Sequence, residues 1–116
     1  EISKFIPVEL QTKMNELWKK EFTVKTETMV DSPFVTLKIK LIPVEDLKSV
    51  DCFMNLWEQN ILTIARADGG NYFVAIATGT QNTKVFIIDA DLCSQNVCKD
   101  LIVGWNSIKS FLNSIK

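Results

Sequence analysis

The sequence has no histidine among its 116 residues, and this absence excludes the commonest catalytic groups. Without imidazole the chain cannot form a Ser/His or Cys/His dyad, and it lacks the ligand that most catalytic zinc sites require. Thirteen basic residues are matched by fourteen acidic ones, so the net charge of −1 leaves no excess positive charge for a phosphate backbone. We therefore expect a binding protein with no catalytic residues, no cofactor and no nucleic-acid partner.

Long apolar runs are also missing. The longest, from Tyr72 to Ala77, is far shorter than the ~20 residues of a membrane-spanning helix, so we expect a soluble chain that does not bind membranes. The start, Glu1-Ile2-Ser3-Lys4, does not resemble a signal peptide, and the missing initiator Met leaves a trimmed or processed chain open. The length and the 47% hydrophobic content predict one domain over residues 1–116, and they do not indicate an oligomeric state.

Cysteine is scarce, with only Cys52, Cys93 and Cys98. So small and odd a number favours free thiols in a reducing compartment, and we expect the cytoplasm. The alternative is a bridge between Cys93 and Cys98 in an oxidising compartment. Because the spacing of these two is C-x4-C and no histidine is present, a tetrahedral zinc site cannot be completed, and we expect no metal.

Hydrophobic periodicity predicts a helix near each end of the chain. The first runs from about Pro7 to Lys20, and its apolar residues recur at helical spacing: Leu10, Met14, Leu17 and Trp18. Asn106 or Ser107 is expected to cap the second helix, whose apolar stripe is Ile108, Phe111, Leu112 and Ile115. The three tryptophans at helix positions are expected in the core: Trp18, Trp57 and Trp105.

Alternation with period two predicts strands between these helices. A hairpin of about 22–30 with 34–42 has one apolar and one polar face, and three further strands follow at 61–67, 71–78 and 84–88. The last of these has no internal polar residue and is expected to be covered on both faces. The turns at Asp68-Gly69-Gly70 and 79–82 suit antiparallel pairing. The fold class is therefore α+β, with an antiparallel sheet of about five strands and both terminal helices packed against it.

Two less regular segments complete this prediction. Pro43 is expected to open a short helix, and Asp51 to cap a further turn or two that points Phe53, Met54 and Trp57 inward. About twelve residues after Asp91 are expected to be mostly loop.

Several charged and polar residues are candidates for chemistry. Asp89 and Asp91 are suited to a divalent cation, but two carboxylates are seldom enough, and we favour a turn cap. Arg66, the only arginine, is expected to pair with Asp68 slightly more readily than to anchor a partner. Tyr72 and its neighbour Phe73 point to opposite sides of one strand, so one of the two is an interface candidate.

Five segments resemble the motifs of one protein family. Ile42-Pro43-Val44-Glu45-Asp46-Leu47 is similar to LxPLEEL, and the stretch from Ile61 to Phe73, with Gly69-Gly70-Asn71-Tyr72-Phe73, is similar to iPIaxxxGGNYFxL. The other three are similar to GxVYxxDHD, SFxEFL and LPxDY, and they lie at 84–91, 108–112 and 7–10. Taken in chain order, the motifs cover most of the sequence and resemble those of the SUKH superfamily, which includes fungal cell-wall-synthesis regulators and bacterial toxin-immunity proteins. Ala90 stands where that family often has histidine.

The resemblance implies an α+β domain that has no catalytic activity and acts by binding a protein. We therefore predict an immunity protein that neutralises a cognate bacterial toxin by occlusion in the cytoplasm. The alternatives are a regulatory scaffold domain of a larger protein and a small carboxylate-dependent hydrolase. The predicted partner-binding surface faces a basic toxin cleft and consists of Arg66, Asp68, Asn71, Tyr72, Asp89 and Asp91.

Overall fold

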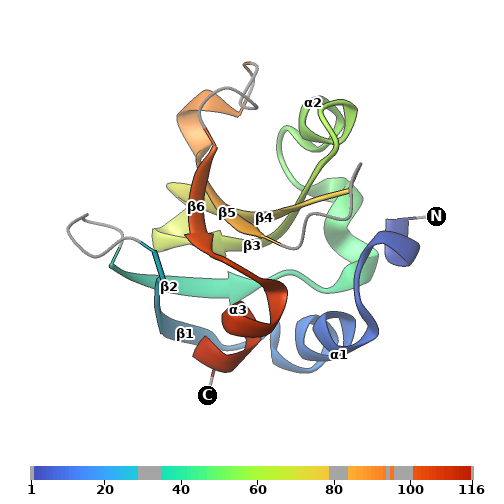
Figure 1. Cartoon of the computed structure of the whole chain (residues 1–116). Coiled ribbons are helices and arrows are strands. Elements are labelled where there is room, and N and C mark those ends of the chain that lie inside the picture. Colours follow the sequence, from blue (N-terminus) through green and yellow to red (C-terminus); the bar gives the residue numbers. More distant parts are fainter. Residues whose placement is uncertain (1, 29–34, 79–83, 94, 96–100, 116) are drawn as a thin grey trace.

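The protein has an α+β fold in which six strands form one antiparallel sheet (Figure 1). The computed structural model describes residues 2–28, 35–78, 84–93, 95 and 101–115. The strands follow one another in the sheet in chain order: β1 (Glu21–Lys25), β2 (Thr36–Leu41), β3 (Ile61–Ala67), β4 (Tyr72–Ala77), β5 (Val85–Asp89) and β6 (Ile102–Trp105). The helices are η1 (Ile2–Phe5), α1 (Val8–Leu17), η2 (Val44–Ser49), α2 (Phe53–Glu58), η3 (Asp68–Gly70), η4 (Ala90–Leu92) and α3 (Ile108–Ser114).

The sixth strand, β6, corrects the predicted count of about five. It falls within and just after the segment expected to be loop, because its four residues, which include Gly104, show no alternation of polar and apolar side chains. It pairs antiparallel with β5, and Trp105 is the partner of Val85. Pairing with β5, rather than a local pattern of side chains, makes this segment a strand.

The last strand also meets the first, so the sheet curls back on itself. The Gly104 carbonyl oxygen accepts from the backbone N–H groups of Glu27 and Thr28, at 2.8 and 3.2 Å. Trp105 Nε1 donates to the Lys25 carbonyl at 3.1 Å, and the Thr28 hydroxyl donates to Val103. The residues just after β1 therefore satisfy backbone groups of β6 that would otherwise form an open sheet edge.

Alternation in the first hairpin is confirmed for the described strands. Leu37, Ile39 and Leu41 are buried, whereas the residues between them are exposed, and Val24 of β1 lies opposite Leu37. The predicted hairpin residues 29–34 lie outside the described residues. The four apolar residues of β5, 85–88, are all buried, which confirms that this strand is covered on both faces.

The two terminal helices border a common pocket, and Figure 1 shows them beside each other, with α2 on the other side of the sheet. Ser107 is the N-cap of α3, since its hydroxyl oxygen accepts from the Ser110 N–H at 3.0 Å. Helix α1 ends at Leu17, so Trp18 falls outside its buried stripe and is 37% exposed. The prediction of a core position is wrong for Trp18 and right for Trp105, which is 1% exposed.

The segment between β2 and β3 matches the prediction in part. Pro43 precedes η2 as expected, but the residue before α2 is Cys52, in a left-handed conformation with φ of 66°, and not Asp51. The buried face of α2 also differs from the prediction: Met54, predicted inward, is 61% exposed, and Leu56 is buried instead.

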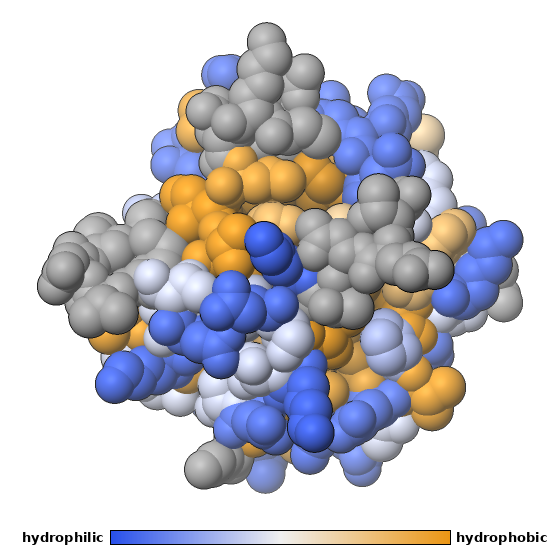
Figure 2. All heavy atoms as spheres, viewed as in Figure 1, coloured by the Kyte–Doolittle hydropathy of each residue, from blue (hydrophilic) through white to orange (hydrophobic). Residues whose placement is uncertain are grey.

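Hydrophilic and hydrophobic side chains gather in different regions of the surface (Figure 2). Figure 2 shows hydrophilic atoms over most of the lower half of one face and hydrophobic atoms gathered along β6. In that region Leu101, Ile102 and Val103 are half-buried. Among the described residues, no helix has the length and apolar character needed to cross a membrane.

Candidate functional site

Five of the six predicted partner-binding residues lie at one end of the sheet. The turn η3 joins β3 to β4 there, and β5 ends beside it, because Tyr72 is the register partner of Asp89. The Ala90 N–H donates to the Asn71 carbonyl at 3.0 Å and ties the two turns together. We call this group the acidic end: Asp68, Asn71, Tyr72, Asp89 and Asp91.

The carboxylates of the acidic end bind backbone groups. Asp68 Oδ1 accepts from the Lys38 N–H at 3.1 Å, and Asp68 itself has a left-handed φ of 49°. Asp89 Oδ1 accepts from the Asp91 N–H at 2.9 Å and so caps η4, which confirms the predicted turn cap. The Asp91 side chain is exposed. In the described part of the chain, no three His, Cys, Asp or Glu side chains are grouped so as to hold a metal ion.

Arg66 does not lie with the acidic end. Its register partner in β4 is Phe73, whereas Tyr72 is the partner of Ala67. Because side chains alternate between the faces of a strand, Arg66 projects from the face opposite to Tyr72 and Asp89. The described residues do not show the predicted pair of Arg66 with Asp68, since Asp68 binds the backbone of β2 instead.

The choice between Tyr72 and Phe73 is settled by burial. Phe73 is 4% exposed, whereas Tyr72 is only half-buried. Tyr72 is therefore the interface candidate of the two.

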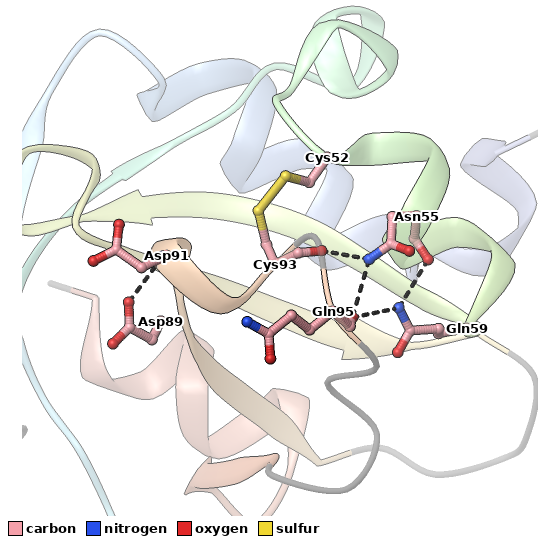
Figure 3. Close-up of a disulfide and its surroundings, with 7 residues drawn as sticks. All are labelled: Cys52, Asn55, Gln59, Asp89, Asp91, Cys93 and Gln95. Atoms are coloured by element: carbon pink, nitrogen blue, oxygen red, sulfur yellow. Dashed lines mark hydrogen bonds between the residues drawn. A yellow bond between two sulfur atoms is a disulfide. The ribbon is translucent and has the colours of Figure 1, made fainter.

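A disulfide joins Cys52 to Cys93 behind the acidic end (Figure 3). The two residues are 41 positions apart, and their Cα atoms are separated by 6.0 Å. The expectation of free thiols is wrong for this pair, and so is the alternative bridge of Cys93 with Cys98; Cys98 lies outside the described residues. Local spacing gave no sign of the pairing, because only the folded sheet brings the start of α2 close to the end of η4.

Side chains of α2 hold the chain that follows η4. Asn55 Nδ2 donates to the carbonyl oxygens of Cys93 and Gln95, the latter at 3.1 Å, and Gln59 Nε2 donates to Gln95 at 3.1 Å (Figure 3). Together with the disulfide, these bonds fasten the turn that carries Asp89 to a neighbouring helix.

A second charged surface was missed by the sequence analysis. On the outward side of the first three strands, the exposed residues are Glu21, Thr23 and Lys25 of β1, Thr36, Lys38 and Lys40 of β2, and Arg66 of β3. We call this surface the basic face, because it carries four cations and one carboxylate. The alternation of lysines in β2 was visible in the sequence, but the position of Arg66 opposite Lys40 depends on the register.

A pocket of about 380 Å³ adjoins the basic face. Its lining includes Lys40 and Arg66, the exposed Trp18, and two residues of η2, Asp46 and Ser49. This pocket combines positive charge, an aromatic surface and one carboxylate.

Comparison of the chain with protein-family models, curated proteins and solved structures found no match. The resemblance to the SUKH superfamily therefore stays a prediction, and function has to be inferred from the charge and geometry of the two surfaces.

Proposed function

We propose that the protein is a non-enzymatic binding module that covers a protein partner with its acidic end. In this proposal the partner is a bacterial toxin, and the protein acts as an immunity protein by occluding the toxin's basic cleft. The observation that carries the proposal is the gathering of Asp68, Tyr72 and Asp89 by three neighbouring strands at one end of the sheet. A carboxylate-rich surface attracts a basic partner and disfavours acidic ones.

The way the acidic end is held supports a binding role. Hydrogen bonds to Asp68 and Asp89, the bond between Ala90 and Asn71, and the disulfide behind them fix the turns before a partner arrives. A surface that is already ordered loses less conformational entropy on association. Tyr72 adds an aromatic side chain, the type that is enriched among the residues that dominate interface energies.

The same bonds favour binding over a carboxylate-dependent hydrolase. Such an enzyme uses one carboxylic acid to protonate a leaving group and a second carboxylate as base or nucleophile. Asp68 and Asp89 each accept a backbone N–H, so both carboxylates already have a structural use.

The disulfide is evidence about the cellular compartment in which the protein works. Disulfides persist in oxidising compartments and are rare in the cytosol, where thiols are kept reduced. The bond between Cys52 and Cys93 thus favours an oxidising compartment over the predicted cytoplasm. Alkylation of freshly lysed native cells, followed by mass spectrometry of the peptides that contain Cys52 and Cys93, would distinguish the two locations.

Binding to the product of a toxin gene adjacent to the chain's own gene tests the function. The variant Asp68→Asn/Asp89→Asn/Asp91→Asn removes three charges and keeps the amide oxygens that accept the backbone hydrogen bonds. We expect it to bind at least about tenfold more weakly in calorimetry, a loss of about 1.4 kcal/mol.

The matched control is Glu9→Gln/Glu16→Gln/Glu58→Gln, which removes three exposed carboxylates elsewhere on the surface and should bind like the parent protein. Equal loss in both variants would point to long-range charge alone and contradict a specific acidic end. Turnover of a substrate that one Asp→Asn change abolishes would contradict the non-enzymatic role.

A further inference from the structure

The basic face has a charge opposite to that of the whole molecule. The chain has a net charge of −1, yet Lys25, Lys38, Lys40 and Arg66 share one exposed sheet surface with a single carboxylate, Glu21. Arg66 projects from the face opposite to Tyr72 and Asp89, so the two surfaces lie mainly on different faces of the sheet and adjoin where Asp68 accepts from the Lys38 N–H. An inference from it does not depend on the proposed function.

The register makes three of these cations a compact group. Lys38 and Lys40 are two residues apart on one side of β2, which places their Cα atoms about 7 Å apart. Arg66 is the register partner of Lys40, on a strand about 5 Å away. In the described part of the chain no carboxylate forms an ion pair with this group; Asp68 binds the backbone of Lys38.

Folding does not account for this arrangement. Like charges directly opposite each other on neighbouring strands destabilise a sheet, and Lys40 lies between Glu21 on one side and Arg66 on the other. Glu21 offsets one of the cations at most. A threonine at position 40 would suit an exposed strand better than lysine. Pairing across the strands therefore gives Lys40 and Arg66 little net stabilisation, and their charges are available to a ligand.

We propose that the basic face binds an extended acidic segment of a protein partner, with carboxylates at alternate positions. In an extended chain, side chains two residues apart are also about 7 Å apart on one side, which matches Lys38 and Lys40. The pocket beside Lys40 and Arg66 then receives one carboxylate, with the apolar part of its side chain against Trp18.

A protein ligand fits the site better than a nucleic acid. Trp18 in the adjoining pocket is a single aromatic surface, and the seven residues of the basic face include no aromatic side chain, so a run of bases has no series of rings along the strands on which to stack. The pocket wall includes Asp46, whose carboxylate can accept a peptide N–H, a donor that a phosphate group lacks. Arg66 suits a carboxylate, because its guanidinium can bind both oxygens at once.

Two peptides of identical composition test the proposal: Glu-Ser-Glu-Ser-Glu-Ser-Glu and Glu-Glu-Glu-Glu-Ser-Ser-Ser, each with a fluorescent label. We expect the alternating peptide to bind the full chain more tightly in fluorescence anisotropy. The variant Lys38→Gln/Lys40→Gln should lower its affinity by about tenfold or more. The control Lys4→Gln/Lys109→Gln removes two exposed cations outside the basic face and should leave the affinity unchanged.

Thermal melting of each variant separates a lost contact from a lost fold. A Lys38→Gln/Lys40→Gln protein that melts at or above the parent temperature but binds more weakly supports the proposal. Equal affinity for the two peptides, no binding at millimolar peptide, or tighter binding of an oligonucleotide of equal charge would each overturn it. Because the acidic end is unchanged in this variant, toxin binding should be retained, so the two proposals can fail separately.

Discussion

At the acidic end, carboxylates accept hydrogen bonds from the backbone, and a disulfide fastens Cys93, the residue that follows η4. On the basic face, the cations lie on paired strands, and among the described residues none of them forms an ion pair. In the first region the carboxylates stabilise the fold as hydrogen-bond acceptors, whereas in the second the pair of Lys40 with Arg66 opposes it. Removing an acceptor from the acidic end should therefore destabilise the protein, and removing Lys40 from the basic face should stabilise it.

The two surfaces also differ in how freely they adapt to a partner. The turns of the acidic end are fixed in one shape, which favours a partner of complementary shape. Lysine side chains have four rotatable bonds and a compact charge, so the basic face can adjust to ligands of varied sequence. We accordingly expect narrow specificity at the acidic end and broader specificity, governed by charge spacing, on the basic face.

The largest effect should come from breaking the disulfide. Cys52→Ser/Cys93→Ser removes a cross-link that closes a loop of 41 residues, and we expect the free energy of unfolding to fall by about 2–4 kcal/mol. Urea titration monitored by circular dichroism measures the loss. Peptide binding to the basic face should be retained in the absence of urea, while toxin binding weakens. Equal weakening of both would show that the two surfaces are not independently held.

Loss of the cap at the end of β5 should have the next largest effect. Asp89→Ala leaves the Asp91 N–H without its acceptor, and we expect a loss of stability of about 1 kcal/mol. Asp89→Asn keeps an acceptor oxygen and should restore most of that stability while still lacking the charge. If the Asn variant were as unstable as the Ala variant, the charge and not the hydrogen bond would hold the turn.

On the basic face the sign should reverse. Lys40→Thr removes the repulsion from Arg66, and we expect a gain in stability of about 0.2–1 kcal/mol with a loss of peptide binding. Differential scanning calorimetry on the parent and variant proteins checks the gain. A clear loss of stability would mean that the attraction of Lys40 to Glu21 dominates, and the contrast between the two regions would disappear.

The smallest effect concerns Glu27, an exposed carboxylate between β1 and α3. The Asn106 backbone N–H, which donates to Oε1 at 2.8 Å, and the Ser110 side chain lower the pKa of Glu27 below its ordinary value of 4.5. A lowered folded-state pKa contributes stability above the ordinary value and loses it as pH falls through the folded-state pKa. Glu27→Gln should therefore flatten the stability profile below about pH 4.5, as measured by urea titration at several pH values.

Local signals predicted the parts of the fold that depend on neighbouring residues. Alternation in β2, the continuous apolar run in β5 and the Ser107 cap are all read within a few residues. Strand β6 depends on its pairing with β5 and on the residues after β1, and the disulfide joins residues 41 positions apart, so their own sequence carries little sign of either. The inward prediction for Met54 is wrong, because the buried side of so short a helix depends on the elements it packs against and not on its own sequence.

The sequence likewise predicted some residues of the candidate site and missed others. Asp89 was correctly assigned as a cap, because its carboxylate reaches an N–H two residues along. The prediction that places Arg66 with the acidic end is wrong. The face of the sheet from which Arg66 projects depends on the register of β3 with β4 across the turn at 68–70. The basic face could have been found by counting charges on alternate positions of 36–40, but the contribution of Arg66 required the pairing of β2 with β3.

The meeting of the last strand with the residues after the first has a consequence for synthesis on the ribosome. Lys25, Glu27 and Thr28 emerge early, yet their partners Val103, Gly104 and Trp105 are translated more than seventy residues later. Contacts so distant along the chain slow folding, and a nascent chain stalled before Gly104 leaves this seam unpaired. Completion of the sheet is thus tied to the emergence of β6 from the ribosome.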